Sequence, residues 1–265
     1  MPEWVAVILL GIIEGVTEFL PISSTGHLLL AENSGLLPPQ TELFNVVIQG
    51  GAVLAVFLAF SGRVRALVSS LGDPDTRDYV LKLIVAFALT GIGGLAAKKA
   101  GFALPKDVGP IAWATLGGGV AILIIEWTRG ARARDTKITW PMAVTVGLAQ
   151  ILAAVLPGTS RAGATILFAV ALGLNRPAAT AFSFLVGIPT LFAASGYEIY
   201  RELTHPAGAA TGWGMVALGT AVSTLVAFVV VRWILRWVQT HTFVAFGWYR
   251  IALGLLMIAV GDRLR

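Results

Sequence analysis

Six apolar runs along the chain are each long enough to cross a bilayer as a helix. They lie near residues 43–60, 83–101, 110–127, 179–197, 213–235 and 243–260. A helix needs about 20 mostly apolar residues to span the hydrocarbon region. The pattern therefore predicts an all-α integral membrane protein with about six transmembrane helices. The longest polar gap between these runs, residues 61–82, is predicted to be a loop.

Two further apolar regions, residues 4–33 and 141–172, are interrupted near their centres by PISSTG and PGTSRAG. Proline, glycine and hydroxyl residues break a helix there and free backbone groups that lipid cannot satisfy. Such breaks persist at membrane depth only where protein or a wet cavity surrounds them. Both regions are therefore predicted to be re-entrant helical hairpins, each returning to the side from which it entered.

The two interrupted regions resemble each other at one constant offset. The alignment pairs Gly11 with Gly147, Glu14 with Gln150, Leu20 with Leu156, Pro21 with Pro157 and Ser24 with Ser160. Three predicted spans separate the hairpins, so the hairpins would enter from opposite faces, as in an inverted-topology repeat. We expect a single membrane domain over 1–265, with repeat 1 at about 1–127 and repeat 2 at about 138–265. Chance similarity is the alternative.

Composition fits a membrane protein, with 57% hydrophobic and 12% charged residues. The net charge of +5 could suggest a nucleic-acid partner. The basic residues, however, flank the apolar runs, where orientation in the bilayer accounts for them, so we expect no nucleic-acid binding. The chain contains no cysteine, which excludes disulfides, thiolate metal sites and a cysteine nucleophile.

The basic flanks also predict the orientation. One side of the predicted topology collects eleven of them: Arg63, Arg65, Arg77, Lys82, Arg129, Arg132, Arg134, Lys137, Arg176, Arg232 and Arg236. The other side collects six: Lys98, Lys99, Lys106, Arg201, Arg263 and Arg265. Because the richer side is cytoplasmic by the positive-inside rule, both termini and the mouth of the first hairpin are expected to face outward.

Glu14 and Glu18 are four residues apart and so share one helix face. Two carboxylates buried together repel, and each costs on the order of 3 kcal/mol at membrane depth. A divalent metal, an arginine or a shared proton could offset this cost, and a metal fits best if the ligand is itself an anion. The alternative is that both carboxylates are solvated near the interface.

The two breaks combine features of anion sites. Ser23, Ser24 and Thr25 in the first break, and Thr159 or Ser160 in the second, are residues that cap helix N-termini, where free N–H groups bind anions. Gly158 helps to end the preceding helix, and Arg161 adds a planar fork of donors suited to phosphate. Serines cap helices in many proteins, so singly they could be structural. An unpaired arginine in an apolar hairpin is harder to explain without a ligand.

His27 and Arg250 are further polar residues in apolar surroundings. His27 lies three residues after Ser24, a spacing that suits a hydroxyl nucleophile beside a general base or acid. A satisfied core histidine is the alternative. Arg250 is a candidate phosphate ligand, or a side chain that reaches for the interface. Asn45 and Gln49 are expected to bond between helices.

The segments EGVTEFLPISSTGH, FNVVIQGGAVLAV, PGTSRAGATI and FGWYRIALG together resemble the undecaprenyl-diphosphate phosphatase family, also known as the bacitracin-resistance family. The match runs from the N-terminus to the last span. The resemblance implies a bacterial plasma-membrane enzyme that removes the terminal phosphate of the C55 isoprenoid diphosphate and so recycles the lipid carrier of cell-wall synthesis. It also implies a need for Mg2+ or Ca2+ and an active site open to the extracytoplasmic side.

Carried over by residue, the resemblance assigns Glu14 and Glu18 to metal or proton handling. Ser24 and His27 become the hydrolytic centre, with either Ser24 or a water as nucleophile. The residues expected to bind or stabilise phosphate are Ser23, Thr25, Gly158, Thr159, Ser160, Arg161, Thr165 and Arg250. Two positions depart from the family pattern: Ala162 stands where the family usually has serine, and Asn45 where it has an acid.

The competing function is transport. Broken helices in an inverted repeat are typical of carriers, so the chain could flip an isoprenoid phosphate lipid instead of cleaving it. A purely structural role does not account for Glu14, Glu18, His27 and Arg161 in apolar segments. The oligomeric state is left open, with a homodimer as one option.

Overall fold

The structure is a computed structural model that describes residues 1–33, 35–101, 108–206 and 212–261. Within these ranges it forms eleven α-helices and one π-helical turn, so the all-α prediction is confirmed. The elements are α1 Glu3–Thr17, α2 Ser24–Asn33, α3 Glu42–Ala59, α4 Ser61–Ser69, α5 Pro74–Lys99, α6 Val108–Ile125, η1 Glu126–Gly130, α7 Trp140–Val155, α8 Arg161–Ala171, α9 Arg176–Thr204, α10 Trp213–Trp237 and α11 Val244–Gly261.

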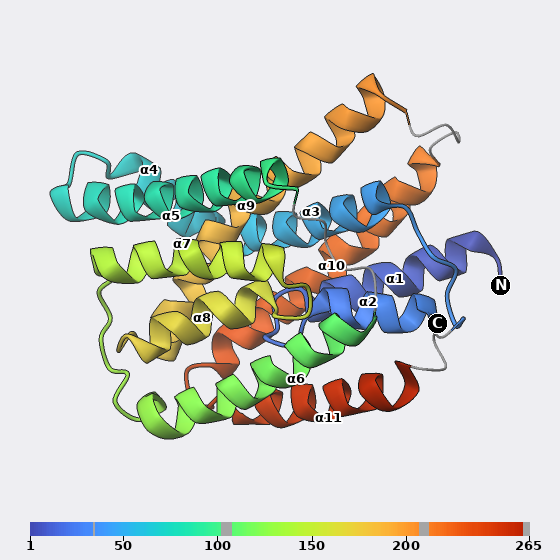
Figure 1. Ribbon diagram of the computed structural model, residues 1–265. Coiled ribbons are helices and arrows are strands. Elements are labelled where there is room, and N and C mark those ends of the chain that lie inside the picture. Colours follow the sequence, from blue (N-terminus) through green and yellow to red (C-terminus); the bar gives the residue numbers. More distant parts are fainter. Residues whose placement is uncertain (34, 102–107, 207–211, 262–265) are drawn as a thin grey trace.

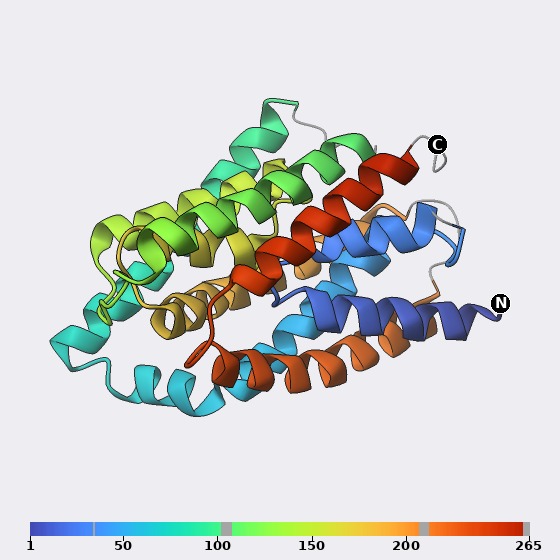
Figure 2. The same ribbon diagram turned by 90° about the horizontal axis from the view of Figure 1, so that it is seen from below.

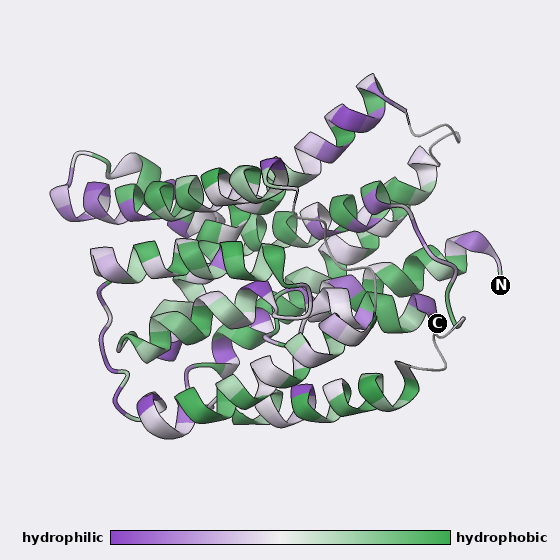
Figure 3. Cartoon of the chain, in the orientation of Figure 1, coloured by the Kyte–Doolittle hydropathy of each residue, from purple (hydrophilic) through white to green (hydrophobic). Residues whose placement is uncertain are grey.

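Five helices are long and apolar enough to cross a membrane: α3, α5, α6, α9 and α10. The sixth predicted span forms α11, which belongs to the shorter apolar helices together with α7 and α8. Apolar side chains in the spans face outward, including Ile92 at 68% and Leu225 at 70% exposure, as expected for a surface in contact with lipid. Figure 3 shows hydrophobic colour along the spans and hydrophilic colour at several helix ends.

Both interrupted regions form pairs of short helices, α1–α2 and α7–α8. The helices end before the prolines that were expected to end them: α1 ends at Thr17, ahead of Pro21, and α7 at Val155, ahead of Pro157. The residue before a proline avoids helical dihedral angles, which accounts for Leu156, directly before Pro157, at φ −115° and ψ 85°. Glu18, three residues before Pro21, still has helical angles, so this rule does not explain the end of α1. The order of hairpin, three helical crossings, hairpin is compatible with an inverted repeat, which stays a prediction.

The prediction of a loop over residues 61–82 is wrong. Residues Ser61–Ser69 form α4, and α5 already begins at Pro74. The start of α5 is fixed by Asp73, whose carboxylate accepts hydrogen bonds from the backbone N–H and the hydroxyl of Thr76, both at 2.8 Å. These bonds lower the pKa of Asp73. A charged segment such as SGRVRALVS still forms a helix here because it has good helix formers and no internal proline.

The helices pack along their lengths. The N-terminal end of α1 and the C-terminal end of α11 lie on the same side of the bundle (Figures 1 and 2). In the packing, α3 contacts α9 and α10, α1 contacts α10, α5 contacts α7, and α6 contacts α11. Small residues allow close approach: a Cβ at Gly15 of α1 would lie only 2.8 Å from the carbonyl oxygen of Ser223 in α10. Four of the basic groups used above to predict the orientation lie outside the described residues: Lys106, Arg263, Arg265 and the side chain of Lys98.

A buried ion pair fixes the start of α11. Glu126 in η1 accepts bonds from Arg176 Nε at 2.9 Å and Nη2 at 2.5 Å, and from the backbone N–H of Phe243 at 2.8 Å. This single carboxylate therefore ties the end of α6 to the start of α9 and to the chain entering α11. The register of α11 matters because this helix carries Arg250 into the centre of the protein.

Candidate active site

The two break loops meet inside the bundle. Ser160 Oγ of the second loop donates to the carbonyl oxygen of Leu20 in the first loop at 3.4 Å. Arg161 donates to Glu18, with Nη2 at 3.0 Å and Nε at 3.3 Å from Oε1. The sequence prediction that the two breaks come together thus agrees with the geometry of these described residues.

Each loop ends at a serine in the left-handed backbone region, Ser23 at φ 71° and Ser160 at φ 67°. Such a φ is uncommon for residues other than glycine, and the strain clusters at functional sites. Both hydroxyls cap the following helix: Ser23 Oγ accepts from Gly26 N at 3.3 Å and Ser160 Oγ from Gly163 N at 3.1 Å. Ser23 and Ser160 therefore have equivalent positions in the two loops. The sequence alignment pairs Ser24 with Ser160 and is thus shifted by one residue.

These caps place Ser24 and Arg161 at the first positions of α2 and α8, and both contact Glu18. Ser24 Oγ donates to Glu18 Oε2 at 2.6 Å, while Arg161 binds the other oxygen. Glu18 is only 7% exposed. One carboxylate thus joins a hydroxyl from the first hairpin to a guanidinium from the second; we refer to Glu18, Ser24 and Arg161 as the Glu18 cluster.

Two polar groups, one beside this cluster and one within it, lack partners among the described residues. Neither carboxylate oxygen of Glu14 has a hydrogen-bond partner, although the residue is 0% exposed and lies beside Glu18. Arg161 Nη1 is also buried and unpartnered. Buried polar groups are nearly always hydrogen-bonded, so each of these groups is a candidate to bind a ligand, and Glu14 could also share a proton with Glu18. The acceptors suit a cation and the donor suits an anion.

The residues fit a magnesium-type site better than a closed metal cage. Among the described residues, no group of three or more histidine, cysteine, aspartate or glutamate side chains could hold a metal ion. Mg2+ is commonly held by one or two carboxylates together with substrate phosphates and water. Glu14, with two unpartnered oxygens, and Glu18 supply such carboxylates.

His27 does not hydrogen-bond to Ser24. Its Nδ1 faces the carbonyl oxygen of Ser23 at 2.8 Å, and its Nε2 faces the hydroxyl of Tyr249 at 2.6 Å. The two rings stack with their centroids 5.7 Å apart. A carbonyl only accepts, so Nδ1 carries the proton and, in neutral His27, Nε2 accepts from Tyr249. The sequence analysis missed Tyr249, whose one signal was its place beside the embedded Arg250.

Arg250 is 0% exposed, and all five of its N–H groups point at backbone carbonyl oxygens. Nε donates to Thr115 at 3.0 Å; Nη1 donates to Pro21 at 3.2 Å and Thr159 at 2.8 Å; Nη2 donates to Ala114 at 3.2 Å and Gly158 at 2.8 Å. A guanidinium has five N–H donors in total. In this arrangement Arg250 has no donor left for a phosphate.

The remaining candidates lie around this centre. Thr165 is buried and bonds to the carbonyl oxygen of Arg161 at 2.8 Å and to Ser183 Oγ at 2.5 Å, so it braces α8 against α9. Gly158 and Thr159 offer their carbonyls to Arg250. Thr25 is exposed and lines a small cavity of about 100 Å³, together with Leu28, Leu29, Glu32, Asn45 and Gln49.

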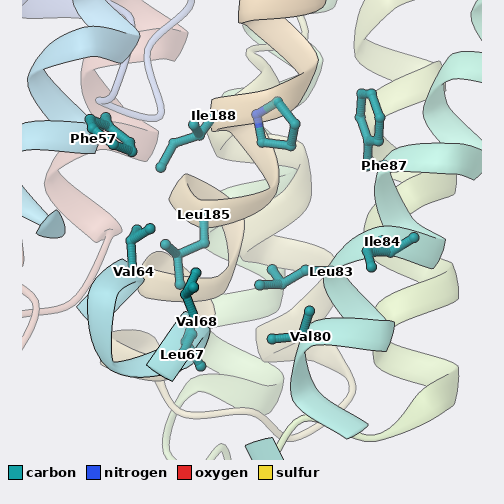
Figure 4. A pocket seen from close by; sticks show the side chains of 11 residues that line it. Phe57, Val64, Leu67, Val68, Val80, Leu83, Ile84, Phe87, Leu185 and Ile188 are labelled. Atoms are coloured by element: carbon teal, nitrogen blue, oxygen red, sulfur yellow. The ribbon is translucent and has the colours of Figure 1, made fainter. Parts of the chain in front are cut away.

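A larger groove of about 280 Å³ lies between α3, α4, α5 and α9. Figure 4 shows its lining of apolar side chains: Phe57, Val64, Leu67, Val68, Val80, Leu83, Ile84, Phe87, Leu185, Ile188 and Pro189. Because it has no charged or hydroxyl side chain, the groove supplies no catalytic group. On the same helix α9, Gly187 lies beside Arg161: a Cβ at this position would lie 2.3 Å from Arg161 Nη1.

Comparison with known proteins identifies the family of the chain. A family model described as bacitracin resistance protein BacA matches residues 7–256. The undecaprenyl-diphosphatase of Rhizobium etli (strain CIAT 652) is 48% identical over 259 residues, covering 97% of each chain. The undecaprenyl-diphosphatase of Xanthomonas oryzae pv. oryzae (strain PXO99A) is 47% identical over 259 residues, again covering 97% of each chain.

Proposed function

The chain belongs to the bacitracin resistance protein BacA family, and we propose that the Glu18 cluster is the catalytic centre of its undecaprenyl-diphosphatase activity. The protein is a multi-pass membrane enzyme that hydrolyses undecaprenyl diphosphate to undecaprenyl phosphate and inorganic phosphate. One observation carries the assignment of the centre: a single buried carboxylate holds a hydroxyl at one helix N-terminus and a guanidinium at another.

Arg161 is proposed to bind the terminal phosphate. Its unpartnered Nη1 can donate to a phosphate oxygen while Nε and Nη2 stay bound to Glu18. The free N–H groups at the start of α8 add positive potential at the same place. Phosphoryl transfer needs positioning and charge neutralisation more than covalent help, and these donors provide both.

Ser24 is proposed as the nucleophile. Its hydroxyl already points its proton at Glu18 Oε2, so Glu18 can take the proton as Ser24 Oγ forms a bond to the terminal phosphorus. The bond from that phosphorus to the bridging oxygen breaks, and undecaprenyl phosphate leaves. Water then hydrolyses the phosphoserine, which releases phosphate and returns the proton to Ser24. In the alternative, a water near His27 attacks directly.

Metal binding is proposed at Glu14 and Glu18. A bound Mg2+ or Ca2+ would neutralise charge on the diphosphate. Glu14 contributes two buried oxygens that otherwise lack a partner.

The activity and the nucleophile can be tested with purified protein in detergent. Phosphate release from farnesyl diphosphate is measured with and without a chelator, and rapidly quenched samples are analysed for phosphoserine. We expect chelator-sensitive release, a phosphorylated Ser24, and a loss of about 10³-fold in kcat for Ser24→Ala. Ser61→Ala, at an exposed position in α4, is the matched control.

Detergent solution also separates hydrolysis from transport, because transport has no meaning there. No phosphate release from any isoprenoid diphosphate, combined with lipid movement in vesicles, would support the transporter alternative. Turnover retained in Ser24→Ala would exclude the serine nucleophile and leave the direct attack of water.

The enzyme is proposed to lie in the bacterial plasma membrane with its centre open to the extracytoplasmic side. The excess of basic residues in one set of flanks supports this orientation. The N-terminal end of α1 and the C-terminal end of α11 lie on one side of the bundle, as required if both termini face outward (Figure 1). The cysteine-free chain permits a direct test with the variant Glu3→Cys: a membrane-impermeant maleimide should label it in intact cells. Labelling only after lysis would show that the protein has the opposite orientation.

A further inference from the structure

We infer that Arg250 is a positioning residue that holds the two break loops in a fixed relation, so that Ser24 and Arg161 meet at Glu18. This inference rests on the function proposed for the Glu18 cluster. It departs from the sequence-based expectation that Arg250 binds phosphate, because its five N–H groups all donate to backbone carbonyls.

The carbonyls that Arg250 binds come from three separate parts of the chain. Pro21 belongs to the first loop, and Gly158 and Thr159 belong to the second. The other two carbonyls belong to α6. Pro21 lies two residues before the cap of α2, and Thr159 lies directly before the cap of α8. One rigid guanidinium therefore sets the distance between the starts of two helices.

These loop carbonyls need such a donor. A loop at membrane depth has no lipid partner for its backbone groups, and each unsatisfied group would be costly. Arg250 is itself fully buried, and none of the ion pairs between described residues includes it. A buried charge without a carboxylate is tolerated only when its hydrogen bonds are satisfied. The loops and the guanidinium therefore depend on each other.

The planar shape of arginine matters for this task. Five donors in a fixed fork can reach carbonyls from two loops and a helix at once, whereas a lysine offers three donors from a single nitrogen. Arg250→Lys keeps the positive charge but cannot reproduce this geometry. It therefore separates positioning from simple charge.

Helix α6 leaves room for the guanidinium by means of glycine. A Cβ at Gly118 would lie 2.0 Å from Nη2 and 2.5 Å from Cζ of Arg250. Gly118→Ala should thus displace the guanidinium without changing its charge or altering any residue of the Glu18 cluster. Gly117, the preceding residue, is exposed and has nothing within 4 Å of its Cβ position, so Gly117→Ala is a matched control.

The test combines kinetics with hydrogen–deuterium exchange of the full-length protein in detergent. For Gly118→Ala and Arg250→Lys we expect kcat for farnesyl diphosphate to fall about 30-fold or more, since small misplacements at a reacting centre are costly, while KM changes less than about 3-fold. Exchange should rise in peptides covering residues 18–26 and 156–163 and stay unchanged in peptides from α5 and α10. Gly117→Ala should match the wild type in every measurement.

Three outcomes would overturn the inference. The first is normal loop exchange and normal kcat in Gly118→Ala. The second is unchanged exchange with a KM raised about tenfold in Arg250→Lys, which would make Arg250 a phosphate ligand. The third is raised exchange throughout the protein, which would mean general stabilisation. If the wild type releases no phosphate, the proposed function fails, but the exchange data still decide whether Arg250 holds the loops.

Discussion

Arg161 Nη2 lies 3.0 Å from Glu18 Oε1, although the two residues are 143 positions apart in the chain. Each belongs to a different interrupted helical region, so this contact joins the two halves of the protein at one carboxylate. Ser24 binds the other oxygen of that carboxylate. The proposed nucleophile, its proton acceptor and the proposed hydrogen-bond donor to phosphate therefore lie within a single hydrogen-bonded cluster.

Gly187 of α9 should be required for the placement of Arg161. A Cβ at this position would lie 2.3 Å from Arg161 Nη1, the donor proposed to bind phosphate. Gly187→Ala is expected to lower kcat/KM for farnesyl diphosphate about 30-fold or more, because the guanidinium must shift. Gly196→Ala, on the same helix with nothing within 4 Å, should behave as the wild type. Equal activity of the two variants would show that Arg161 does not need its present position.

Glu14 should control the metal requirement. Glu14→Gln removes the charge of an unpartnered buried carboxylate and keeps its shape. We expect the Mg2+ concentration for half-maximal activity to rise at least about tenfold, and Mg2+ binding measured by calorimetry to weaken to match. Glu3→Gln, in the exposed first turn of the same helix, is the control. A metal dependence that is the same in Glu14→Gln and the wild type would place the metal elsewhere.

Tyr249 should orient His27. Tyr249→Phe removes the hydroxyl that lies 2.6 Å from Nε2 and preserves the stacked ring. Losing one hydrogen bond of this kind is expected to lower kcat about 3- to 10-fold. Tyr200→Phe, at an exposed position in α9, provides the comparison. Should kcat stay unchanged in Tyr249→Phe, the hydroxyl would have no part in the reaction.

The sequence was sufficient to predict the helical architecture and the two breaks. Long apolar runs and helix-breaking segments act locally, so the segments 21–26 and 157–163 could be recognised as interruptions without any tertiary information. The helices end slightly earlier than these segments, at Thr17 and Val155. Helix α4 was missed because it is short and charged, although Val64, Leu67 and Val68 follow the helical spacing i, i+3 and i+4.

The connections within the centre could not be predicted in the same way. Ser24 lies three residues from His27 in sequence, yet its hydroxyl bonds to Glu18 across the broken helix. Tyr249 reaches His27 from 222 positions away. Arg250 was expected to bind phosphate or reach the interface, because a sequence shows a buried charge but not the carbonyls around it. These contacts depend on packing between distant helices.

The most direct test of the central claim is a double-mutant cycle of phosphate release between Ser24→Ala, in the first hairpin, and Arg161→Lys, in the second. Residues that act as one unit have non-additive effects. If Ser24→Ala costs about 10³-fold in kcat and Arg161→Lys about 10²-fold, the double variant should lose about 10³-fold, no more than the worse single variant. A loss of about 10⁵-fold, the product of the two effects, would mean that the hairpins act independently and would contradict a shared centre at Glu18.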